Sequence, residues 1–394
     1  MLNKKNVLLG ITGSIAAYKS VDLARRLVEE GANVNVVMTE AASRFITPYT
    51  LESVTGRPVH IDLFKNPFDH LDLPRESDLL IIAPATANTI NKLSCGIADN
   101  LISNIWLAYE GKALIAPAMN ARMYRNRLVQ KHIKKMKKHG VDFAGPVSGS
   151  LACGEDDIGR MSEVPEIVEA AISALTPKDL AGQKILVTAG PTIEPIDPVR
   201  YISNRSSGKM GYAVARAAVS RGADVTLISG PSHQRPVAGA SLITIETASQ
   251  MESALFKNLP KTTAVIMAAA VSDFRPSSKA KVKLDKSAIN TLDIKRNTDI
   301  LLKLVEKKRK FSVVGFAAET GNNIDNARNK LKKKNLDLIV LNDVTQKGAG
   351  FDVDTNIITI ITKKGDISEY PLMKKIEAAN VILDRMLKTK GANK

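Results

Sequence analysis

Three stretches in the first half of the chain carry side chains that could take part in chemistry. Cys153 lies in the glycine-rich stretch 148–161, a composition typical of a mobile lid that carries a thiol. Asn120 and Arg122 lie between two methionines, and this combination can hold a carboxylate against a flat cofactor. His70 precedes an apolar run, and a histidine in such a setting is more often structural than catalytic. From the residues alone, both roles stay open for His70.

Turns rich in small polar residues follow two apolar runs of this half. Gly10–Lys19 leads into a helix, and Ser14 at the helix N-terminus can present donors to a phosphate. The turn has neither the dinucleotide fingerprint nor the Walker spacing, which counts against NAD and against a P-loop nucleotide. Ala83–Thr89 follows a strand at its carboxyl end, where ligands of open α/β sheets collect. Ordinary helix capping is the alternative for both turns.

The second half contains a long loop of prolines and polar residues, 188–211, that ends in a Ser-Ser-Gly helix N-terminus. Loops of this length inside a compact domain are usually functional. A cation-rich segment with Lys281 and Lys283 follows, and a helix start is predicted at Thr298. Together they could hold a triphosphate with Mg²⁺. For each piece taken alone, a solvated charge cluster is the more common explanation.

Length and composition narrow the class of protein. At roughly 150 residues per domain, 394 residues predict two domains or perhaps three, and 44% hydrophobic residues exclude disorder. The net charge of +16 suits nucleic acid, an anionic membrane surface or phosphorylated substrates. The lysine runs 131–138, 306–310 and 330–334 lack interleaved aromatic residues, so solvated helix faces that partly serve a phosphate-rich substrate are favoured over nucleic-acid binding.

The cysteines and the hydropathy pattern exclude other classes. Cys95 and Cys153 are two cysteines without histidines at metal-ligand spacing, so a structural zinc site is not expected. We expect two free thiols, with Cys95 as a small core residue. The chain has no apolar run near the roughly 18 residues of a membrane span and no secretory signal at its start, so we expect a cytoplasmic protein.

Strands and helices alternate in both halves of the chain. Each half opens with a strand, a polar turn, a helix stopped by glycine and a second strand. The predicted openings are strands over 6–10 and 33–38 around a helix over 14–30, and strands over 184–188 and 224–229 around a helix over 210–221. Further strands are predicted over 79–83, 113–116, 264–268, 312–317, 338–341 and 357–361. This pattern predicts two doubly wound, Rossmann-like three-layer αβα domains, with a boundary near residue 180.

The first-half motifs, in this order, resemble the flavin-dependent cysteine decarboxylases. In that family FMN oxidises the cysteinyl moiety to a thioaldehyde, loss of CO₂ gives an enethiol, and the reduced flavin with a lid thiol returns the saturated thiol. The resemblance implies that His70 is catalytic, that Asn120 binds the substrate carboxylate and that Cys153 donates a proton. It further implies FMN contacts from Gly13, Ser14, Thr39, Thr86, Asn88 and Thr89, and substrate contacts from Met119 and Met123. Asp157 stands where this family usually has glycine.

The second-half run 197–211 resembles phosphopantothenate–cysteine ligase. In that family the pantothenate carboxylate attacks the α-phosphate of CTP, and the cysteine amine then displaces CMP from the acyl cytidylate. The resemblance implies that Asn204 stabilises the acyl cytidylate and that Lys281 serves its formation or breakdown from a flexible loop. The nucleotide contacts that it implies are Ala269, Asp273, Asn297, Asp299, Ile300, Phe316, Lys330 and Lys334. Leu284 replaces the last lysine of the family's basic loop, and we expect this change to affect rate rather than abolish activity.

Both resemblances together imply a bifunctional coenzyme A biosynthesis enzyme. Residues 1–180 would form an FMN-dependent phosphopantothenoylcysteine decarboxylase domain, and residues 181–394 a CTP-dependent ligase domain. The implied substrates are 4'-phosphopantothenate, cysteine and CTP with Mg²⁺, with no nucleic-acid or membrane partner. The family also implies a homo-oligomer of trimeric flavoprotein domains and dimeric ligase domains, a dodecamer. The alternatives are a regulatory flavoprotein without decarboxylase activity, which the presence of His70, Asn120 and Cys153 disfavours, and a nucleic-acid-binding protein.

Overall fold

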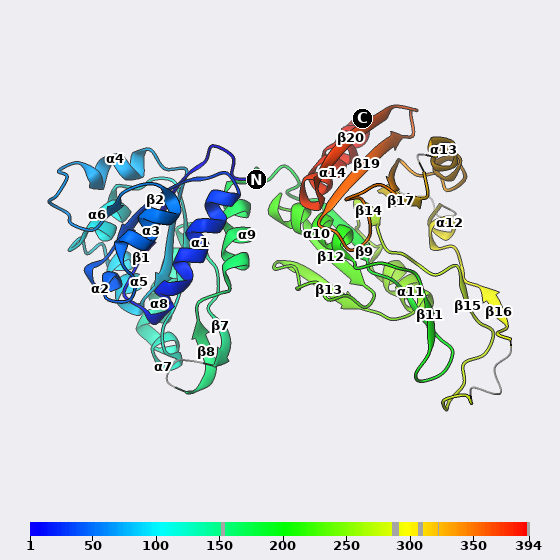
Figure 1. The fold of residues 1–394 in the computed structure, drawn as a ribbon, viewed down its shortest axis with the longest axis horizontal. Coiled ribbons are helices and arrows are strands. Elements are labelled where there is room, and N and C mark those ends of the chain that lie inside the picture. Colours follow the sequence, from blue (N-terminus) through cyan, green and yellow to red (C-terminus); the bar gives the residue numbers. More distant parts are fainter. Residues whose placement is uncertain (151–153, 286–290, 306–309, 322, 392–394) are drawn as a thin grey trace. The chain divides into compact units, whose positions relative to one another are not determined.

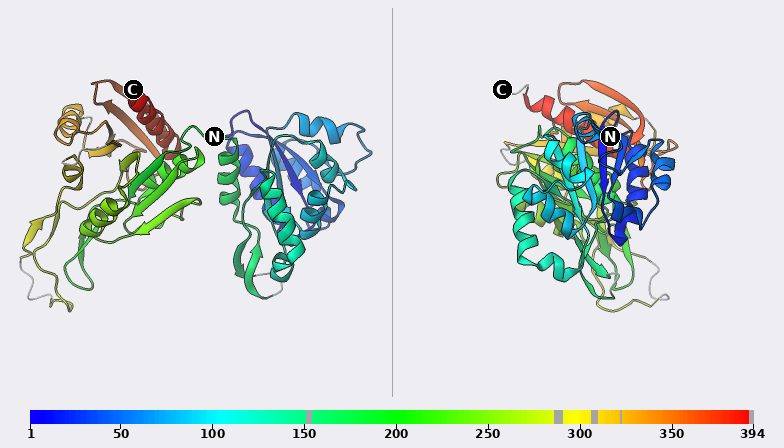
Figure 2. Two further views of the ribbon diagram at one scale, coloured as in Figure 1. Left: turned by 180° about the vertical axis from the view of Figure 1, so that it is seen from behind. Right: turned by 90° about the vertical axis from the view of Figure 1, so that its left-hand side faces the viewer.

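A computed structural model describes residues 1–150, 154–285, 291–305, 310–321 and 323–391 of the chain. Two compact units, Met1–Thr176 and Pro177–Lys394, divide the chain (Figures 1 and 2). Within the described residues, no helix combines the length and the hydropathy that crossing a membrane requires.

The first unit is built on a six-stranded sheet with the order β3-β2-β1-β4-β5-β6, and all its strand pairs are parallel. The sheet strands are β1 (Asn6–Ile11), β2 (Asn33–Met38), β3 (Val59–His60), β4 (Leu79–Ala85), β5 (Lys112–Pro117) and β6 (Asp142–Phe143). The hairpin β7 (Val147–Ser150) and β8 (Asp156–Arg160) follows the sheet. The chain reverses its direction of winding between β1 and β4, which is where doubly wound sheets bind ligands.

Helices cover both faces of this sheet. They are η1 (Ile15–Ala17), α1 (Tyr18–Glu29), α2 (Glu40–Ser43), α3 (Pro48–Thr55), α4 (Asp69–Arg75), α5 (Ala87–Cys95), α6 (Leu101–Ala108), α7 (Ala121–Arg125), α8 (Arg127–Lys138) and α9 (Val164–Leu175). Val7, Leu9 and Ile11 pack with α1 and α9 on one face, whereas Leu8 packs with α5, α6 and α8 on the other. Because both faces are covered, β4 is buried along its whole length.

The second unit is built on an eight-stranded sheet with the order β13-β12-β9-β14-β17-β18-β19-β20. Its strands are β9 (Lys184–Ala189), β12 (Asp224–Ser229), β13 (Ala240–Thr244), β14 (Ala264–Met267), β17 (Ser312–Glu319), β18 (Leu338–Asp343), β19 (Thr355–Thr362) and β20 (Ile367–Lys374). The first six are parallel to one another, whereas β19 runs antiparallel to both of its neighbours, β18 and β20. The predicted strand over 357–361 is therefore present, and a tight turn rather than a helical crossover joins it to β20.

The helices of the second unit again cover two faces. They are α10 (Lys209–Ser220), α11 (Ala248–Asn258), α12 (Ile300–Val305), α13 (Ile324–Lys333) and α14 (Lys375–Gly391). Ile185 and Val187 of β9 pack with α10 and α14, and Leu186 packs on the opposite face with α11, α12 and α13. Two small antiparallel pairs lie outside the sheet: β10 (Ile193–Pro195) with β11 (Tyr201–Ser203), and β15 (Phe274–Pro276) with β16 (Ile294–Arg296). Strand β15 lies beside β10 and β11.

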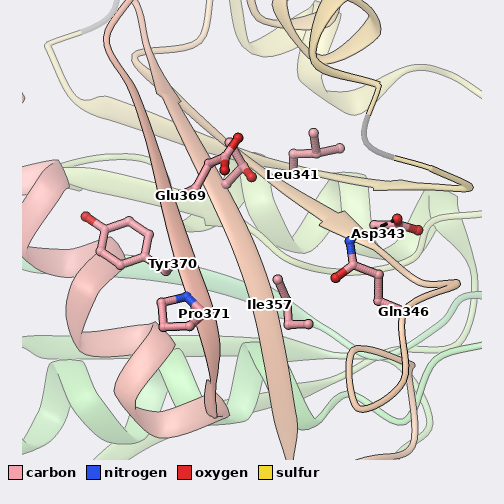
Figure 3. Close-up of a pocket in the computed structure, with 8 residues that line it drawn as sticks. Leu341, Asp343, Gln346, Ile357, Glu369, Tyr370 and Pro371 are labelled. Atoms are coloured by element: carbon pink, nitrogen blue, oxygen red, sulfur yellow. Dashed lines mark hydrogen bonds between the residues drawn. The ribbon is translucent and has the colours of Figure 1, made fainter.

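The predicted fold class of two doubly wound αβα units is confirmed. The helix expected from about residue 14 starts later than predicted, because the 3₁₀ turn η1 separates Ser14 from α1. The lysine run 131–138 lies in α8 and the run 330–334 ends α13, as expected, while 306–309 lies outside the described residues. A hollow of about 380 Å³ on β18–β20, lined by Asp343, Gln346, Glu369 and their neighbours (Figure 3), contains none of the predicted site residues.

Candidate active sites

Three helix starts lie at the carboxyl ends of the neighbouring strands β1, β2 and β4. Ser14 Oγ, Thr39 Oγ1 and Thr86 Oγ1 each accept a backbone N–H from the first turn, at 3.2 Å in all three cases. Each of these N-cap residues has extended backbone angles, which aims its side chain at the turn. A hydroxyl that accepts an amide N–H still has its own proton to donate, so this edge of the sheet can bind an anion.

Gly13 lies at the same edge, tightly packed against the start of α2. A Cβ on this residue would lie 2.6 Å from Ala41 Cβ, so the turn after β1 and helix α2 approach as closely as a glycine permits. Thr89 is buried, with its hydroxyl 3.0 Å from the Thr86 hydroxyl, and Asn88 is exposed on the first turn of α5. The predicted flavin contacts thus lie on adjoining turns, and their donors suit a group that carries a phosphate.

His70 lies on the first turn of α4. Its Nδ1 atom is buried and has no hydrogen-bond partner among the described residues. A buried polar atom without a partner is costly, which favours a group that meets its partner when a ligand binds. The preceding residue, Asp69, accepts a hydrogen bond from Asn66 and lies 2.6 Å from Nδ1 of His60. Asp69 therefore links the start of α4 to β3.

Asn120 is the N-cap of α7 and faces the hairpin β7–β8. Its Oδ1 accepts the Arg122 N–H at 2.8 Å, and its Nδ2 donates to Glu155 Oε2 at 3.3 Å. Arg122 reaches the other oxygen of Glu155 at 3.3 Å. Asn120 and Arg122 thus both contact the carboxylate of Glu155.

The other residues predicted for this region are less closely gathered. The Met119 N–H donates to Gly159 O at 3.0 Å, which attaches β8 to the start of α7, and Met123 is exposed. Cys153 lies outside the described residues. Asp157 forms two hydrogen bonds with Arg125, at 2.6 and 2.5 Å, and these bonds hold the pKa of the Asp157 carboxyl below its usual range. This pair is a second attachment of the hairpin.

The expectation that Cys95 is a core residue is wrong. Cys95 is the last residue of α5 and is exposed as a free thiol. The buried positions at this end of α5 are Leu93 and Ser94, so Cys95 lies on the exposed side of the helix end, before the left-handed cap Gly96. The thiol lies 3.9 Å from Nε2 of His132.

In the second unit, close backbone contacts shape the edge where β9 and β12 end. A Cβ on Gly230 would lie 1.7 Å from Pro191 O, so no other residue fits at this position. Gly208 is the N-cap of α10, and Ser207 O accepts a hydrogen bond from the Ser232 hydroxyl at 2.8 Å. Asn204 is exposed, and its Nδ2 donates to Val271 O in the segment after β14, at 3.0 Å.

Cations and carboxylates gather next to this edge. Lys330 Nζ donates to Phe316 O and Lys334 pairs with Asp299, both at 2.8 Å. Burial, and then the neighbouring Lys334, lower the pKa of Lys330, while Glu319, Asp299 and Asp273 oppose this shift. The predicted nucleotide contacts Asp273, Asp299, Phe316, Lys330 and Lys334 therefore form one cluster.

The remaining predicted contacts adjoin that cluster. The Asn297 N–H donates to Asp273 O at 2.8 Å. Ala269 follows β14, and its N–H donates to Thr188 Oγ1 at 3.2 Å. The helix start expected at Thr298 comes later: α12 begins at the buried Ile300, and Asp299 accepts the Leu302 N–H at 3.2 Å. Lys281 is exposed in the loop after β15. The structure describes no group of three or more histidine, cysteine or acidic side chains arranged to hold a metal ion.

Comparisons with known proteins match each of the two units. A family model described as Flavoprotein matches residues 1–176, and one described as DNA/pantothenate metabolism flavoprotein C-terminal domain matches residues 180–389. The coenzyme A biosynthesis bifunctional protein CoaBC of Bacillus subtilis is 45% identical over 395 residues, 98% of this chain and 97% of the relative. The CoaBC protein of Vibrio cholerae is 43% identical over 388 residues, 96% and 97% of the two chains.

The chain belongs to the CoaBC family of coenzyme A biosynthesis proteins. It is accordingly a bifunctional enzyme, with a flavoprotein decarboxylase domain and a ligase domain, and FMN is the cofactor that its family indicates. A crystal structure of the C-terminal domain of a CoaBC protein is 40% identical, covers 54% of this chain and 98% of that chain, and has a TM-score of 0.46.

The structure of this CoaBC family member also contains site residues that the sequence did not reveal. Glu155 lies against Asn120 and Arg122, and Arg275 donates to Asn297 Oδ1 at 2.9 Å. Asp197 and Arg200 belong to the motif 197–211, but the sequence predicted no role for them. They pair with each other, but Leu284, the residue that both contact, lies far along the chain, so the spacing of residues within one motif held no signal for that contact.

Proposed function

We propose that residues 181–394 join 4'-phosphopantothenate to cysteine at the expense of CTP, and that residues 1–180 decarboxylate the product to 4'-phosphopantetheine. The main support is that each unit gathers the polar residues of one motif set at the carboxyl edge of its parallel sheet. The net charge of +16 suits substrates that carry phosphate or carboxylate groups.

In the first unit, Gly13, Ser14, Thr39 and the turn Thr86–Thr89 hold the flavin. Their fit to it rests on the three hydroxyls at adjoining helix starts and on the close approach at Gly13. When bound, FMN supplies the electron transfer that makes this decarboxylation possible. The protein contributes orientation, proton transfer and the exclusion of water.

Three residues of the first unit take part in the reaction. His70 accepts the thiol proton of the cysteinyl group, and its partnerless Nδ1 supports this role. Asn120 holds the carboxylate that is lost, with Met119 and Met123 beside it, and its present contact with Glu155 supports an affinity for carboxylates. Cys153 returns a proton at the end of the reaction.

In the second unit, the carboxylate of 4'-phosphopantothenate attacks the α-phosphorus of CTP and expels pyrophosphate. The cysteine amine then attacks the acyl carbon and expels CMP. Asn204 stabilises the acyl cytidylate, and Lys281 neutralises charge that develops on the phosphate during its formation or breakdown. Both side chains are exposed and therefore accessible to a substrate.

The cluster around Lys330 and Lys334 binds the nucleotide, together with Ala269, Asp273, Asn297, Asp299, Ile300 and Phe316. The ion pair between Lys334 and Asp299 and the burial of Lys330 support a preorganised cationic site. Mg²⁺ enters with the triphosphate, which supplies most of its ligands. By family resemblance, the flavoprotein domains form trimers and the ligase domains pair, giving a dodecamer.

Mass spectrometry of one reaction tests both halves of this proposal. The tube contains the purified protein with bound flavin, 4'-phosphopantothenate, cysteine, CTP and Mg²⁺. We expect 4'-phosphopantetheine and CMP. Accumulation of the cysteinyl conjugate would contradict the decarboxylase half, and absence of both the conjugate and 4'-phosphopantetheine would contradict the ligase half. The variants Cys153→Ser and Lys281→Gln serve as controls, because each is expected to slow one activity strongly and spare the other.

A further inference from the structure

The loop that carries Lys281 is attached to the rest of the second unit on both sides of this lysine. Before it, the Ala280 N–H donates to Ile196 O at 2.9 Å. After it, the Leu284 N–H donates to Asp197 Oδ2 at 3.2 Å. Both acceptors lie in the connection between β10 and β11. Residues 281–283 therefore lie between two attached residues, Ala280 and Leu284.

Asp197 and Arg200 both form hydrogen bonds with the main chain of Leu284. Asp197 Oδ2 accepts the Nε–H of Arg200 at 2.9 Å as well as the Leu284 N–H. Arg200 Nη2 in turn donates to Leu284 O at 2.6 Å. Both main-chain polar groups of Leu284 are thus held, and its side chain contributes none of these bonds. These bonds therefore do not require the lysine that leucine replaces at this position.

The Asp197 side chain is fully buried, at 0% exposure. Burial raises the pKa of its carboxyl, but hydrogen bonds from the Val199 and Arg200 amides, the Arg200 guanidinium and the Leu284 amide outweigh burial and hold the pKa well below its usual range. The carboxylate is therefore charged at any pH at which the enzyme is assayed. A buried charge that is fully paired in this way fixes the geometry of its partners.

We propose that Asp197, acting with Arg200, is a positioning residue that holds Lys281 in place for the ligase reaction. This inference rests on the role proposed above for Lys281. Asp197 lies one loop away from the proposed chemistry and acts through the main chain of residues 280–284. Loss of the attachment leaves the lysine present but displaced, and a displacement of about 1 Å can cost on the order of a hundredfold in rate.

The first test is Asp197→Asn. Asparagine keeps an oxygen for the Val199 and Arg200 amides but loses the charge that Arg200 and Leu284 share. We expect the kcat of ligation to fall by about tenfold to a hundredfold, with a smaller change in the KM for CTP. Decarboxylation of phosphopantothenoylcysteine supplied directly reports on the first unit and is expected to be unchanged. A ligation kcat equal to that of the wild type would overturn the proposal.

A double-mutant cycle separates positioning from a general structural role. If Asp197 acts through Lys281, the double variant Asp197→Asn/Lys281→Gln is expected to be as slow as Lys281→Gln alone. A double variant that is slower by the full factor of Asp197→Asn would contradict the proposal. The rate of amide hydrogen exchange of residues 280–284 should rise in Asp197→Asn. A cooperative thermal unfolding transition of the second unit serves as the control that this variant still folds.

Asp343 provides a matched control in the same unit. Its Oδ1 accepts the Gly321 and Thr345 amides, both at 3.0 Å, and the Thr345 hydroxyl and these amides lower its pKa to about 2. The effect of Asp343→Asn is expected to add to that of Lys281→Gln. Ligation by Lys281→Gln at the wild-type rate would overturn the role of Lys281 and, with it, the positioning role of Asp197. If the wild-type protein catalyses no ligation, the proposed function itself is overturned.

Discussion

The two active-site edges are held in place by contacts of different range. In the first unit, Ser14, Thr39 and Thr86 accept amides that lie two or three residues further along the chain. In the second unit, Arg200 and Asp197 contact Leu284 across 84 and 87 residues. The first arrangement forms with each helix start, whereas the second exists only after the whole unit has folded.

This difference has consequences for how each site responds to substitution. A helix N-cap contributes about 1 kcal/mol, and its loss disturbs one turn. A long-range attachment such as that of Leu284 holds an entire loop, so its loss moves every residue on the loop. We therefore expect the first site to lose activity when a side chain that contacts the ligand is replaced. The second site should also lose activity when residues remote from the substrate are replaced.

The largest expected effect is on His70, an individual side chain of the first site. His70→Asn should lower the rate of decarboxylation by about a hundredfold or more, because a positioned acid–base group contributes at least this factor. Ligation should continue, so the cysteinyl conjugate should accumulate in the coupled assay. A matched control is His139→Asn at the C-cap of α8, which should leave both rates unchanged. Decarboxylation by His70→Asn at the wild-type rate would remove this residue from the mechanism.

The next effect concerns the turn after β1. Gly13→Val places a Cβ 2.6 Å from Ala41 Cβ, so helix α2 must move away from the flavin edge. We expect purified Gly13→Val to lose most of its bound flavin, measured by visible absorbance, while ligation is retained. Gly350→Ala, where a Cβ meets nothing within 4 Å, controls for the loss of a glycine. Normal flavin content in Gly13→Val would show that this close approach does not matter for binding.

The range of contacts also explains what the sequence could predict. The strands over 33–38 and 224–229 were predicted with their observed bounds, since continuous apolar runs and glycine helix stops are local signals. The strand Ile367–Lys374 was missed, because it lies at the sheet edge and alternates exposed and half-buried residues. Asn204 and Lys281 were selected through the family motifs, whereas the partners of Asp197 depend on two segments that meet only in the folded unit.

A smaller effect is expected at the nucleotide cluster. Lys334 pairs with Asp299 at 2.8 Å, with 19% of its side chain exposed. Lys334→Met removes one charge-assisted contact with the triphosphate, which should raise the KM for CTP by about tenfold with little change in kcat. The neighbouring Lys333, exposed at the end of α13, gives the control Lys333→Met, for which we expect the wild-type KM. Equal effects of the two variants would mean that overall charge, and not the Lys334 contact, attracts the nucleotide.

The smallest effect is expected where the first unit itself uses a long-range contact. Arg125 and Asp157 join α7 to β8, but 61% of the arginine side chain is exposed to water. Exposed ion pairs contribute little, and the Met119 N–H to Gly159 O bond attaches the same hairpin independently. Asp157→Gly, which restores the residue usual in this family, should therefore change the decarboxylation rate by less than about twofold. A loss of about tenfold, measured on phosphopantothenoylcysteine, would show instead that the first site also depends on a contact between distant segments, and the contrast between the two units would then weaken.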